Sequence, residues 1–205
     1  DYAETDPGPH RRNPVKGYRV IRDAMIRMGS GWKGPRVLLL VVGSKAPDEN
    51  FAGLDIRFVS HAGDAEAVRT CYLAADVYIH GATEDNFPNT VLEALACGTP
   101  VVSTAAGGIP EQVRPARVPG ITAGAAARNL ADHPPEESTG ILVPVGDSAL
   151  LAKAVEWILS NGGTRRLMGI HAAKDARLRF GLDRQLDDYE KVYAALAGRE
   201  GGRRV

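Results

Sequence analysis

Short apolar runs alternate with stretches of helical periodicity along the whole chain. The apolar or β-branched runs, which are typical of buried strands, lie at 37–42, 55–59, 76–80, 101–102 and 139–144. Apolar residues that recur at three- and four-residue steps indicate helices at 18–28, after Asp64, at 89–97, after Asp147, after Gly163 and after Leu182. This alternation favours an α/β fold, a Rossmann-like doubly wound parallel sheet with helices on both faces, with its ligand site at the carboxyl edge of the sheet.

Three of the predicted helices have well-marked apolar faces. The first repeats Tyr18, Ile21, Ala24, Met25 and Met28. The helix capped by Asp64 is expected to bury Ala67, Val68, Cys71, Tyr72, Ala74 and Ala75. The last helix repeats Leu186, Tyr189, Val192, Tyr193 and Leu196. Before it, Gly162 and Gly163 are expected to separate two further helices.

The remaining segments are predicted to be loops within a single domain that spans 1–205. A polar, proline-containing loop is expected at 1–15, and a second loop at 46–54. The segment 114–138 is rich in proline, arginine and alanine and is interpreted as an insertion, mobile or with one short helix. This segment is either a surface insertion without a function or a functional one, which acts as a lid or contacts the acceptor. The charged, glycine-rich end at 198–205 is expected to fray.

Composition narrows the class of partner. The 205 residues include 25 basic and 25 acidic side chains, so neither nucleic acid nor an anionic membrane is expected as a partner. No apolar run approaches the roughly 20 residues of a membrane helix, and nothing at the amino end is typical of a signal peptide. A cytoplasmic location is therefore expected, although attachment to a membrane through residues outside this chain stays open.

The helix at 89–97 is framed by residues that favour its two ends. Pro88 suits the first turn of a helix, where its missing N–H costs no intrahelical bond, and Gly98 suits the position just past the end. Strands are predicted on both sides of this helix, so its amino end should lie at the carboxyl edge of the sheet.

Anion binding is expected at that amino end. The backbone N–H groups around Asn89, Thr90 and Val91 are predicted to be free there, which is typical of a phosphate site. Two acids frame the same place, since seven residues separate Asp85 in the loop from Glu93 in the helix. Glu93 lies about one turn into the helix, where a carboxylate can accept two hydrogen bonds from the vicinal hydroxyls of a ribose.

These residues resemble a known family. The spacing of Asp85 and Glu93, the sequence that follows at 89–102, and Gly-Gly-Ile-Pro-Glu at 107–111 are similar to the donor-binding half of glycosyltransferase family 4, which has the GT-B fold. That family usually has glutamate at both acidic positions. Asp85 therefore stands where a glutamate is common, and the neighbouring Glu84 is one position out of register.

The resemblance implies the C-terminal half of a GT-B architecture and a retaining glycosyltransferase that needs no bound metal or other cofactor. Its donor would be a nucleotide-diphosphate sugar, UDP- or GDP-linked, and its acceptor a glycan, a lipid or a small molecule. By the same resemblance, Glu93 orients the ribose, the amides at 89–91 meet the diphosphate, and Asp85 or Glu84 contacts the donor sugar near its reacting carbon.

Basic residues for the diphosphate are also implied by the resemblance. In the family a lysine stands before a glycine at the head of the first helix, often with an arginine upstream, and Lys16 and Arg11 have this spacing, with Arg12 as a competitor of Arg11. The family also places a strand before this loop, and none is visible. Either the chain is a fragment or the sheet is short by one strand. The N-terminal acceptor-binding domain is absent from the sequence.

The cysteines, the histidines and the glycines at 107–108 give weaker signals of function. Cys71, Cys97 and the five histidines show no metal-ligand spacing, so no metal site is expected. His80 ends a predicted strand beside the proposed site, and a supporting role is favoured over catalysis. The glycines at 107–108 allow close backbone approach, either to a ligand or to the neighbouring strand.

Two other functional classes stay open. A binding or regulatory module could keep the nucleotide-sugar pocket without catalysis, because half of a two-domain cleft cannot position an acceptor. Another GT-B enzyme, such as an epimerase or a phosphorylase, would need a different set of motifs. Because half of a two-domain cleft cannot position an acceptor, the chain alone is expected to bind the donor and to transfer nothing.

Overall fold

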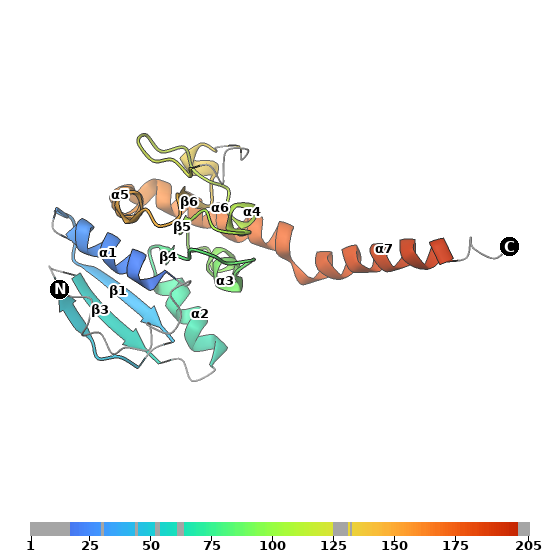
Figure 1. Cartoon of the computed structure of the whole chain (residues 1–205), viewed down its shortest axis with the longest axis horizontal. Helices are drawn as coiled ribbons and strands as arrows, with labels where there is room; N and C mark the ends of the chain where they lie inside the picture. The colour runs from blue at the N-terminus through green and yellow to red at the C-terminus, as the bar shows by residue number, and fades with distance from the viewer. Residues whose placement is uncertain are drawn as a thin grey trace.

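The computed structural model describes residues 17–29, 31–43, 45–51, 54–60, 64–124, 131 and 133–200 of the chain. In order, its elements are α1 (Tyr18–Gly29), β1 (Val37–Val42), β2 (Glu49–Phe51), β3 (Leu54–Val59), α2 (Ala65–Ala74), β4 (Tyr78–His80), α3 (Asn89–Ala96), β5 (Val101–Thr104), α4 (Ile109–Gln112), the 3-10 helix η4 (Pro135–Glu137), β6 (Gly140–Val143), α5 (Ser148–Ser160), α6 (Gly162–Phe180) and α7 (Leu182–Glu200) (Figure 1).

The strands lie in two three-stranded sheets. One has the order β4-β5-β6 and is parallel throughout, and the other has the order β1-β3-β2, with β1 and β3 parallel. The predicted α/β architecture with parallel strands is confirmed. The sequence favours a single sheet, whereas the described strands form two. β1 and β4 do not pair with each other, so each of them is an edge strand of its own sheet.

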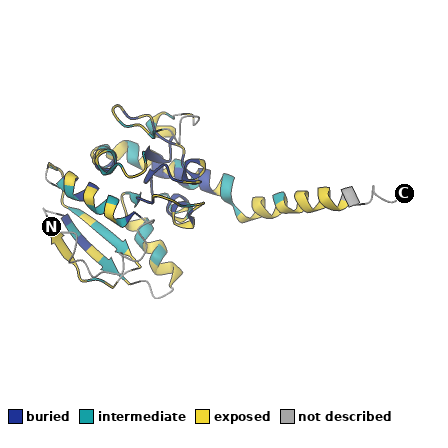
Figure 2. Cartoon of the chain, viewed as in Figure 1, coloured by how far each residue is buried: buried dark blue, intermediate teal, exposed yellow. Residues whose placement is uncertain are grey.

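The sheet β4-β5-β6 is covered on both faces, as the sequence predicts. Every residue of β5 and β6 is buried. Val101 and Leu142 point into a cluster with α3 and α6, whereas Val102 and Ile141 point into a second cluster with α1 and α5. Successive residues of a strand face opposite sides, so apolar residues at neighbouring positions of these parallel strands serve both clusters. Ser103 and Thr104, which end β5, are buried polar residues. Figure 2 shows this buried centre between exposed helices.

The predicted loop at 46–54 contains the short strand β2, so that part of the prediction is wrong. β2 pairs antiparallel with β3, with Glu49 opposite Ile56 and Phe51 opposite Leu54. Two of its three residues are polar, so it has neither an apolar run nor an alternation that a sequence pattern could reveal.

The predicted burial of α2 is also wrong, although its cap is confirmed. Asp64 accepts the N–H of Glu66 at 2.9 Å. No residue of α2 is buried, however, because the helix lies at the margin of the molecule beside α3 (Figure 1). Tyr72 is half-buried and makes the polar contacts of this helix toward the body, where its carbonyl accepts the Thr99 hydroxyl at 2.6 Å.

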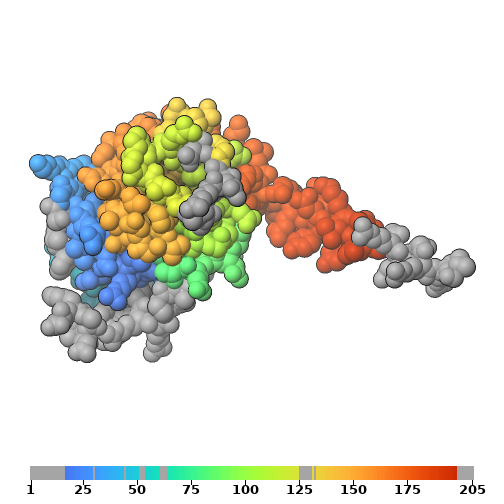
Figure 3. Space-filling model, turned by 45° about the horizontal axis from the view of Figure 1, so that its top comes forward, coloured from blue at the N-terminus to red at the C-terminus, as the bar shows by residue number. Residues whose placement is uncertain are grey.

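The last two helices extend further than the sequence predicts. Gly162 and Gly163 lie inside the first turn of α6, because Asn161 alone separates α5 from α6. α7 runs away from the body and continues to Glu200, into the predicted frayed end (Figure 3). Its apolar residues are each more than half exposed; they are Leu182, Leu186, Tyr189, Val192, Tyr193 and Leu196. Among the described residues, no helix has both the length and the apolar character needed to cross a membrane.

The described part of the predicted insertion at 114–138 packs against the start of β6. The Ala116 N–H donates to the Gly140 carbonyl at 2.8 Å, and the Arg117 N–H donates to the His133 carbonyl at 2.9 Å. Ala116 and Val118 are buried in the core cluster around α1 and α5. These residues therefore belong to the core and are not a surface decoration.

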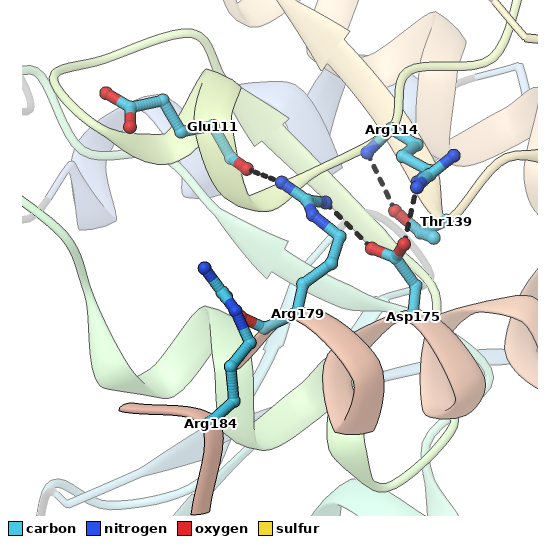
Figure 4. Close-up of polar contacts among 6 residues, drawn as sticks. All are labelled: Glu111, Arg114, Thr139, Asp175, Arg179 and Arg184. Atoms are coloured by element: carbon cyan, nitrogen blue, oxygen red, sulfur yellow. Dashed lines mark hydrogen bonds and ion pairs between the residues drawn. The ribbon is translucent and has the colours of Figure 1, made fainter. Parts of the chain in front are cut away.

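A network around Asp175 joins this segment to α6 and α4 (Figure 4). The Asp175 carboxylate is nearly buried and pairs with Arg114 Nε at 2.7 Å and with Arg179 Nη1 at 2.8 Å. Arg179 also donates to the Glu111 carbonyl, and the Arg114 N–H donates to the Thr139 hydroxyl oxygen at 2.9 Å. One carboxylate thus links the end of α6 to the segments that flank α4.

We predict that Asp175→Ala lowers the free energy of unfolding by about 1.5–3 kcal/mol, the range for hydrogen bonds to charged groups. Asp188→Ala is the matched control, because Asp188 forms a half-exposed ion pair with Arg184 on α7, and its loss should cost less than about 0.5 kcal/mol. Urea unfolding followed by circular dichroism measures both. Equal, small effects would show that the network does not stabilise the fold.

Candidate functional site

Three segments meet at the carboxyl ends of β4 and β5. They are the loop 81–88 that follows β4, the amino end of α3, and the turn before α4. The amino end of α1 reaches the same place: a Cβ on Gly17, which has a φ of 69°, would lie 1.6 Å from the Gly81 carbonyl oxygen. Only a glycine permits this approach, so the chain enters α1 directly beside the loop.

The turn at Gly107 and Gly108 closes onto the backbone of the loop. A Cβ on Gly107 would lie 1.8 Å from the Asp85 carbonyl oxygen, and a Cβ on Gly108 would lie 2.2 Å from the Asn86 carbonyl oxygen. The Gly108 N–H donates to that Asn86 oxygen at 2.9 Å. The sequence leaves open a ligand or a neighbouring strand as the reason for these glycines, and the structure shows instead that they approach the loop.

Two further bonds fix the loop. Gln112, fully buried in α4, donates from Nε2 to the Pro88 carbonyl at 3.1 Å, and the Thr104 hydroxyl at the end of β5 donates to the Ala82 carbonyl. The loop is therefore held to β5 and α4 at both ends, which restricts where Asp85 can lie.

The amino end of α3 differs from the prediction in two details. Pro88 is the N-cap, with φ −66° and ψ 122°, and is not in the first helical turn. The expected free amide at Val91 is wrong, because its N–H donates to the Pro88 carbonyl at 3.2 Å and the residue is fully buried. Asn89 and Thr90 are exposed, so they are left to supply the first-turn amides for an anion.

The two candidate acids of the loop have different surroundings. Asp85 is half-buried and lies with Oδ2 3.5 Å from His80 Nε2. Glu84 is exposed. The third acid, Glu93, is exposed on α3 and accepts the Tyr72 hydroxyl at 3.0 Å. The structure thus places Asp85 against the sheet edge and leaves Glu84 toward solvent.

Two tyrosines that the sequence reasoning did not assign to the site lie between these acids. Tyr72 and Tyr78 pack edge to face with ring centroids 5.6 Å apart, and the Tyr78 hydroxyl lies 3.1 Å from His80 Nδ1. Burial raises the pKa of Tyr78 to about 12, with the charges of Glu93 and Asp85 adding to this effect. Burial also raises the pKa of Tyr72 far above its ordinary value. Both phenols therefore stay protonated at neutral pH and act as hydrogen-bond donors.

A weak signal for Tyr78 exists in the sequence. Tyr78 and His80 are two residues apart on one strand, so they share a face of the sheet. Tyr72 gave no comparable signal, because its position in the helical repeat is equally typical of a core residue.

The outer side of the loop contacts the end of α6. The rings of Phe87 and Phe180 lie edge to face with centroids 5.9 Å apart, and the Arg179 guanidinium lies 4.6 Å from the centre of the Phe180 ring. The point at which α7 leaves the body is thus in contact with the loop that carries Asp85.

Two cavities lie elsewhere on the described part of the chain. One of about 390 Å³ is lined by Trp32, Arg36 and Leu54, and one of about 490 Å³ by Pro100 and Arg165 among others. Both are at the amino ends of the strands, away from Asp85 and Glu93. Within the part of the chain that the structure describes, no three histidine, cysteine or acidic side chains gather as a metal site would require. Arg11 and Lys16 lie outside the described residues.

In chemical terms, the edge combines hydroxyl-binding carboxylates, protonated phenols and the amino end of a helix. Carboxylates accept hydrogen bonds from sugar hydroxyls, and first-turn amides donate hydrogen bonds to an anion. The arrangement therefore suits a ligand that has both hydroxyl groups and a phosphate.

The chain is similar to known glycosyltransferases. The chain is 29% identical over 197 residues to a D-inositol 3-phosphate glycosyltransferase of Saccharomonospora viridis, and the match covers 94% of the chain and 38% of that protein. The chain thus spans about two fifths of the length of this relative.

Solved structures agree on the fold. The structure matches Anabaena HepE in complex with UDP with a TM-score of 0.66 at 20% identity, over 89% of this chain and 46% of that one. It also matches the C-terminal domain of a glycosyl transferase group 1 family protein, LpcC, of Francisella tularensis, with a TM-score of 0.57 at 15% identity, over 82% of both chains.

The family profile described as Glycosyl transferases group 1 matches residues 8–161, which are 154 of the 205 residues. This range contains the loop 81–88, α3 and the turn before α4, and it extends over both sheets. With a match over three quarters of its length and this fold, the chain belongs to the group 1 glycosyltransferases.

Proposed function

We propose that this chain binds a nucleotide-diphosphate sugar at the carboxyl edge of β4 and β5 and supplies the donor site for a retaining glycosyl transfer, as in glycosyltransferase family 4. The observation that carries the proposal is the placement of Asp85 and Glu93 on the two sides of the amino end of α3. Hydroxyl-binding carboxylates thus flank an anion-binding helix terminus, which is the order sugar, diphosphate, ribose along a nucleotide sugar.

The diphosphate would lie at the first turn of α3. Asn89 and Thr90 provide its amides in this proposal, since Val91 is bonded within the turn. Lys16 and Arg11 would add positive charge, which stabilises the leaving diphosphate electrostatically and without a bound metal. Gly17 lies against Gly81, and this supports the assignment of Lys16, its neighbour in the sequence.

Glu93 would bind the ribose. The Tyr72 hydroxyl uses one lone pair of Glu93 Oε2, and a carboxylate accepts up to about four hydrogen bonds, so capacity for the vicinal ribose hydroxyls remains. The bond from Tyr72 also restricts the side chain of Glu93 before the ligand arrives, which lowers the entropy lost on binding.

Asp85, and not Glu84, would contact the donor sugar. Asp85 is half-buried beside His80, whereas Glu84 is exposed. The backbone on either side of Asp85 is held by the turn at Gly108 and by the Pro88 contact of Gln112. A carboxylate on a fixed backbone can favour one orientation of a sugar, and a solvent-exposed one cannot.

A uridine nucleotide is the preferred donor. Anabaena HepE has been solved with UDP and with UDP-glucose, and we extend this to the present chain with GDP-linked sugars as the alternative. No cofactor is part of the proposal. The acceptor is left as a glycan, a lipid or a small molecule, and a cytoplasmic location is kept as part of the proposal.

A second domain would supply the acceptor site. The chain covers 38% of the D-inositol 3-phosphate glycosyltransferase that it resembles. Two features support a further segment: the division of the described strands between β1 and β4, and the exposed apolar residues of α7. The chain alone should therefore bind UDP-glucose and transfer nothing, because it cannot position an acceptor.

Calorimetry with UDP, GDP and their glucose conjugates, followed by a hydrolysis and transfer assay, tests this proposal. Binding without transfer is the expected result. Absence of binding to every nucleotide sugar would contradict the proposed donor site. If the chain joined to its natural neighbouring domain still transferred nothing, the alternative of a binding or regulatory module would be favoured.

We predict that Glu93→Gln weakens UDP binding by about 1.5–3 kcal/mol, roughly ten- to hundredfold in Kd, because charge-assisted hydrogen bonds to the ribose are lost. Glu156→Gln, at an exposed position of α5, is the matched control and should bind as the parent does. Unchanged UDP affinity in Glu93→Gln would remove Glu93 from the ribose site.

We predict that Asp85→Ala weakens UDP-glucose binding about tenfold and leaves UDP binding within about twofold, because the lost contact is to the sugar. Glu84→Ala should change neither. In a two-domain protein the same Asp85 variant should lower kcat by about tenfold or more. A loss confined to Glu84→Ala would reverse the assignment of the two acids.

A further inference from the structure

The ring of His80 connects two parts of the proposed site. It is only 8% exposed at the end of β4. Nδ1 lies 3.1 Å from the Tyr78 hydroxyl, and Nε2 lies 3.5 Å from Asp85 Oδ2. Both ring nitrogens therefore face polar groups, which a residue that only fills space in the core would not need.

The protonated hydroxyl of Tyr78 determines which nitrogen carries the proton. Since the pKa of Tyr78 is raised to about 12, its O–H is available to donate, and Nδ1 of a neutral imidazole then accepts. The ring proton is left on Nε2, the nitrogen that faces the Asp85 carboxylate. If the proton moved to Nδ1, the lone pair of Nε2 would face the Asp85 carboxylate, and the two would repel each other.

The connection continues to the amino end of α3. Thr90 lies near Tyr78, and its hydroxyl lowers the pKa of that phenol. The Tyr78 hydroxyl, His80 and Asp85 form a series of neighbouring polar groups, with Thr90 beside Tyr78. One end lies where the diphosphate is proposed to bind, and the other end is the acid proposed for the sugar.

The geometry points to His80 as a positioning residue, which holds the Asp85 carboxylate in the orientation that contacts the donor sugar. This inference rests on the proposed function. In this inference His80 acts through Asp85 and does not contact the ligand itself. At 3.5 Å the contact with Asp85 is long for a hydrogen bond, and we expect it to shorten when a sugar hydroxyl binds the carboxylate, as contacts of this kind tighten in ligand complexes.

The first test compares three variants by calorimetry with UDP-glucose and with UDP. His80→Leu keeps an apolar side chain of similar volume and should weaken UDP-glucose about tenfold while UDP stays within twofold. His80→Gln can place an amide N–H near the position of Nε2 and should recover most of the loss. His171→Leu, on α6 and remote from the site, is the control and should bind both ligands as the parent does.

A double-variant cycle separates positioning from a general effect on the fold. If His80 acts through Asp85, His80→Leu combined with Asp85→Asn should bind UDP-glucose no more weakly than Asp85→Asn alone. Additive losses, or equal losses for UDP and UDP-glucose, would overturn the inference. Circular dichroism of each variant verifies that the fold is kept.

A ligand-free measurement keeps the inference testable if a variant fails to fold. Nitrogen-15 NMR of the histidine rings in the parent chain should show His80 with its proton on Nε2, and Tyr78→Phe should reduce the population of that tautomer. A proton on Nδ1 in the parent would overturn the inference. Parental binding of UDP-glucose with unchanged selectivity in His80→Leu contradicts only the role of His80, whereas absence of parental binding contradicts the proposed function and this inference with it.

Discussion

The close contact between the turn at Gly107 and Gly108 and the carbonyl groups of Asp85 and Asn86 is the constraint on which the candidate site depends. A Cβ on Gly107 would lie 1.8 Å from the Asp85 carbonyl oxygen, and a Cβ on Gly108 would lie 2.2 Å from the Asn86 carbonyl oxygen. The absence of side chains lets the loop after β4 lie flat against the segment after β5. The acid of the loop, the first turn of α3 and the end of the sheet are thereby brought to one edge.

The sheet explains why this edge is stable enough to hold a site. Because β5 and β6 are buried on both faces between α3 with α6 and α1 with α5, their carboxyl ends cannot move independently of the core. The network around Asp175 fixes the end of α6, and Phe180 of that end contacts Phe87 in the loop. The residues proposed to bind the donor are therefore supported by the core beneath the sheet edge and by the end of α6.

The sequence predicts the parts of the fold in which local chemistry and burial agree. The buried strands β5 and β6, the Asp64 cap and the helix end at Gly98, which has a φ of 76°, are as expected. The apolar run at 37–42 also forms a strand, β1, although none of its residues is buried. The sequence fails where tertiary position decides: β2 has no apolar pattern, α2 lies at the margin, and the two glycines of α6 are accommodated in a helix that begins directly after α5.

At the site, the acids and the helix terminus were predictable because their spacing resembles a family pattern. The bond that occupies the Val91 amide and the roles of Tyr72 and Tyr78 were not, since they depend on how β4, α2 and α3 meet in space. The position of His80 at a predicted strand end suggested that it lies close to the site. Its two neighbours, the Tyr78 hydroxyl and the Asp85 carboxylate, are apparent only in the three-dimensional structure. Family resemblance thus locates the charges, and packing determines which of them face one another.

Chemical-shift mapping of UDP-glucose on the nitrogen-15-labelled chain tests the central claim most directly. Amide shifts should concentrate at Asp85, Thr90, Glu93 and Gly107, at the carboxyl ends of β4 and β5. Shifts concentrated instead around Trp32 and Arg36, or around Arg165, where two cavities lie, would contradict this placement of the donor site.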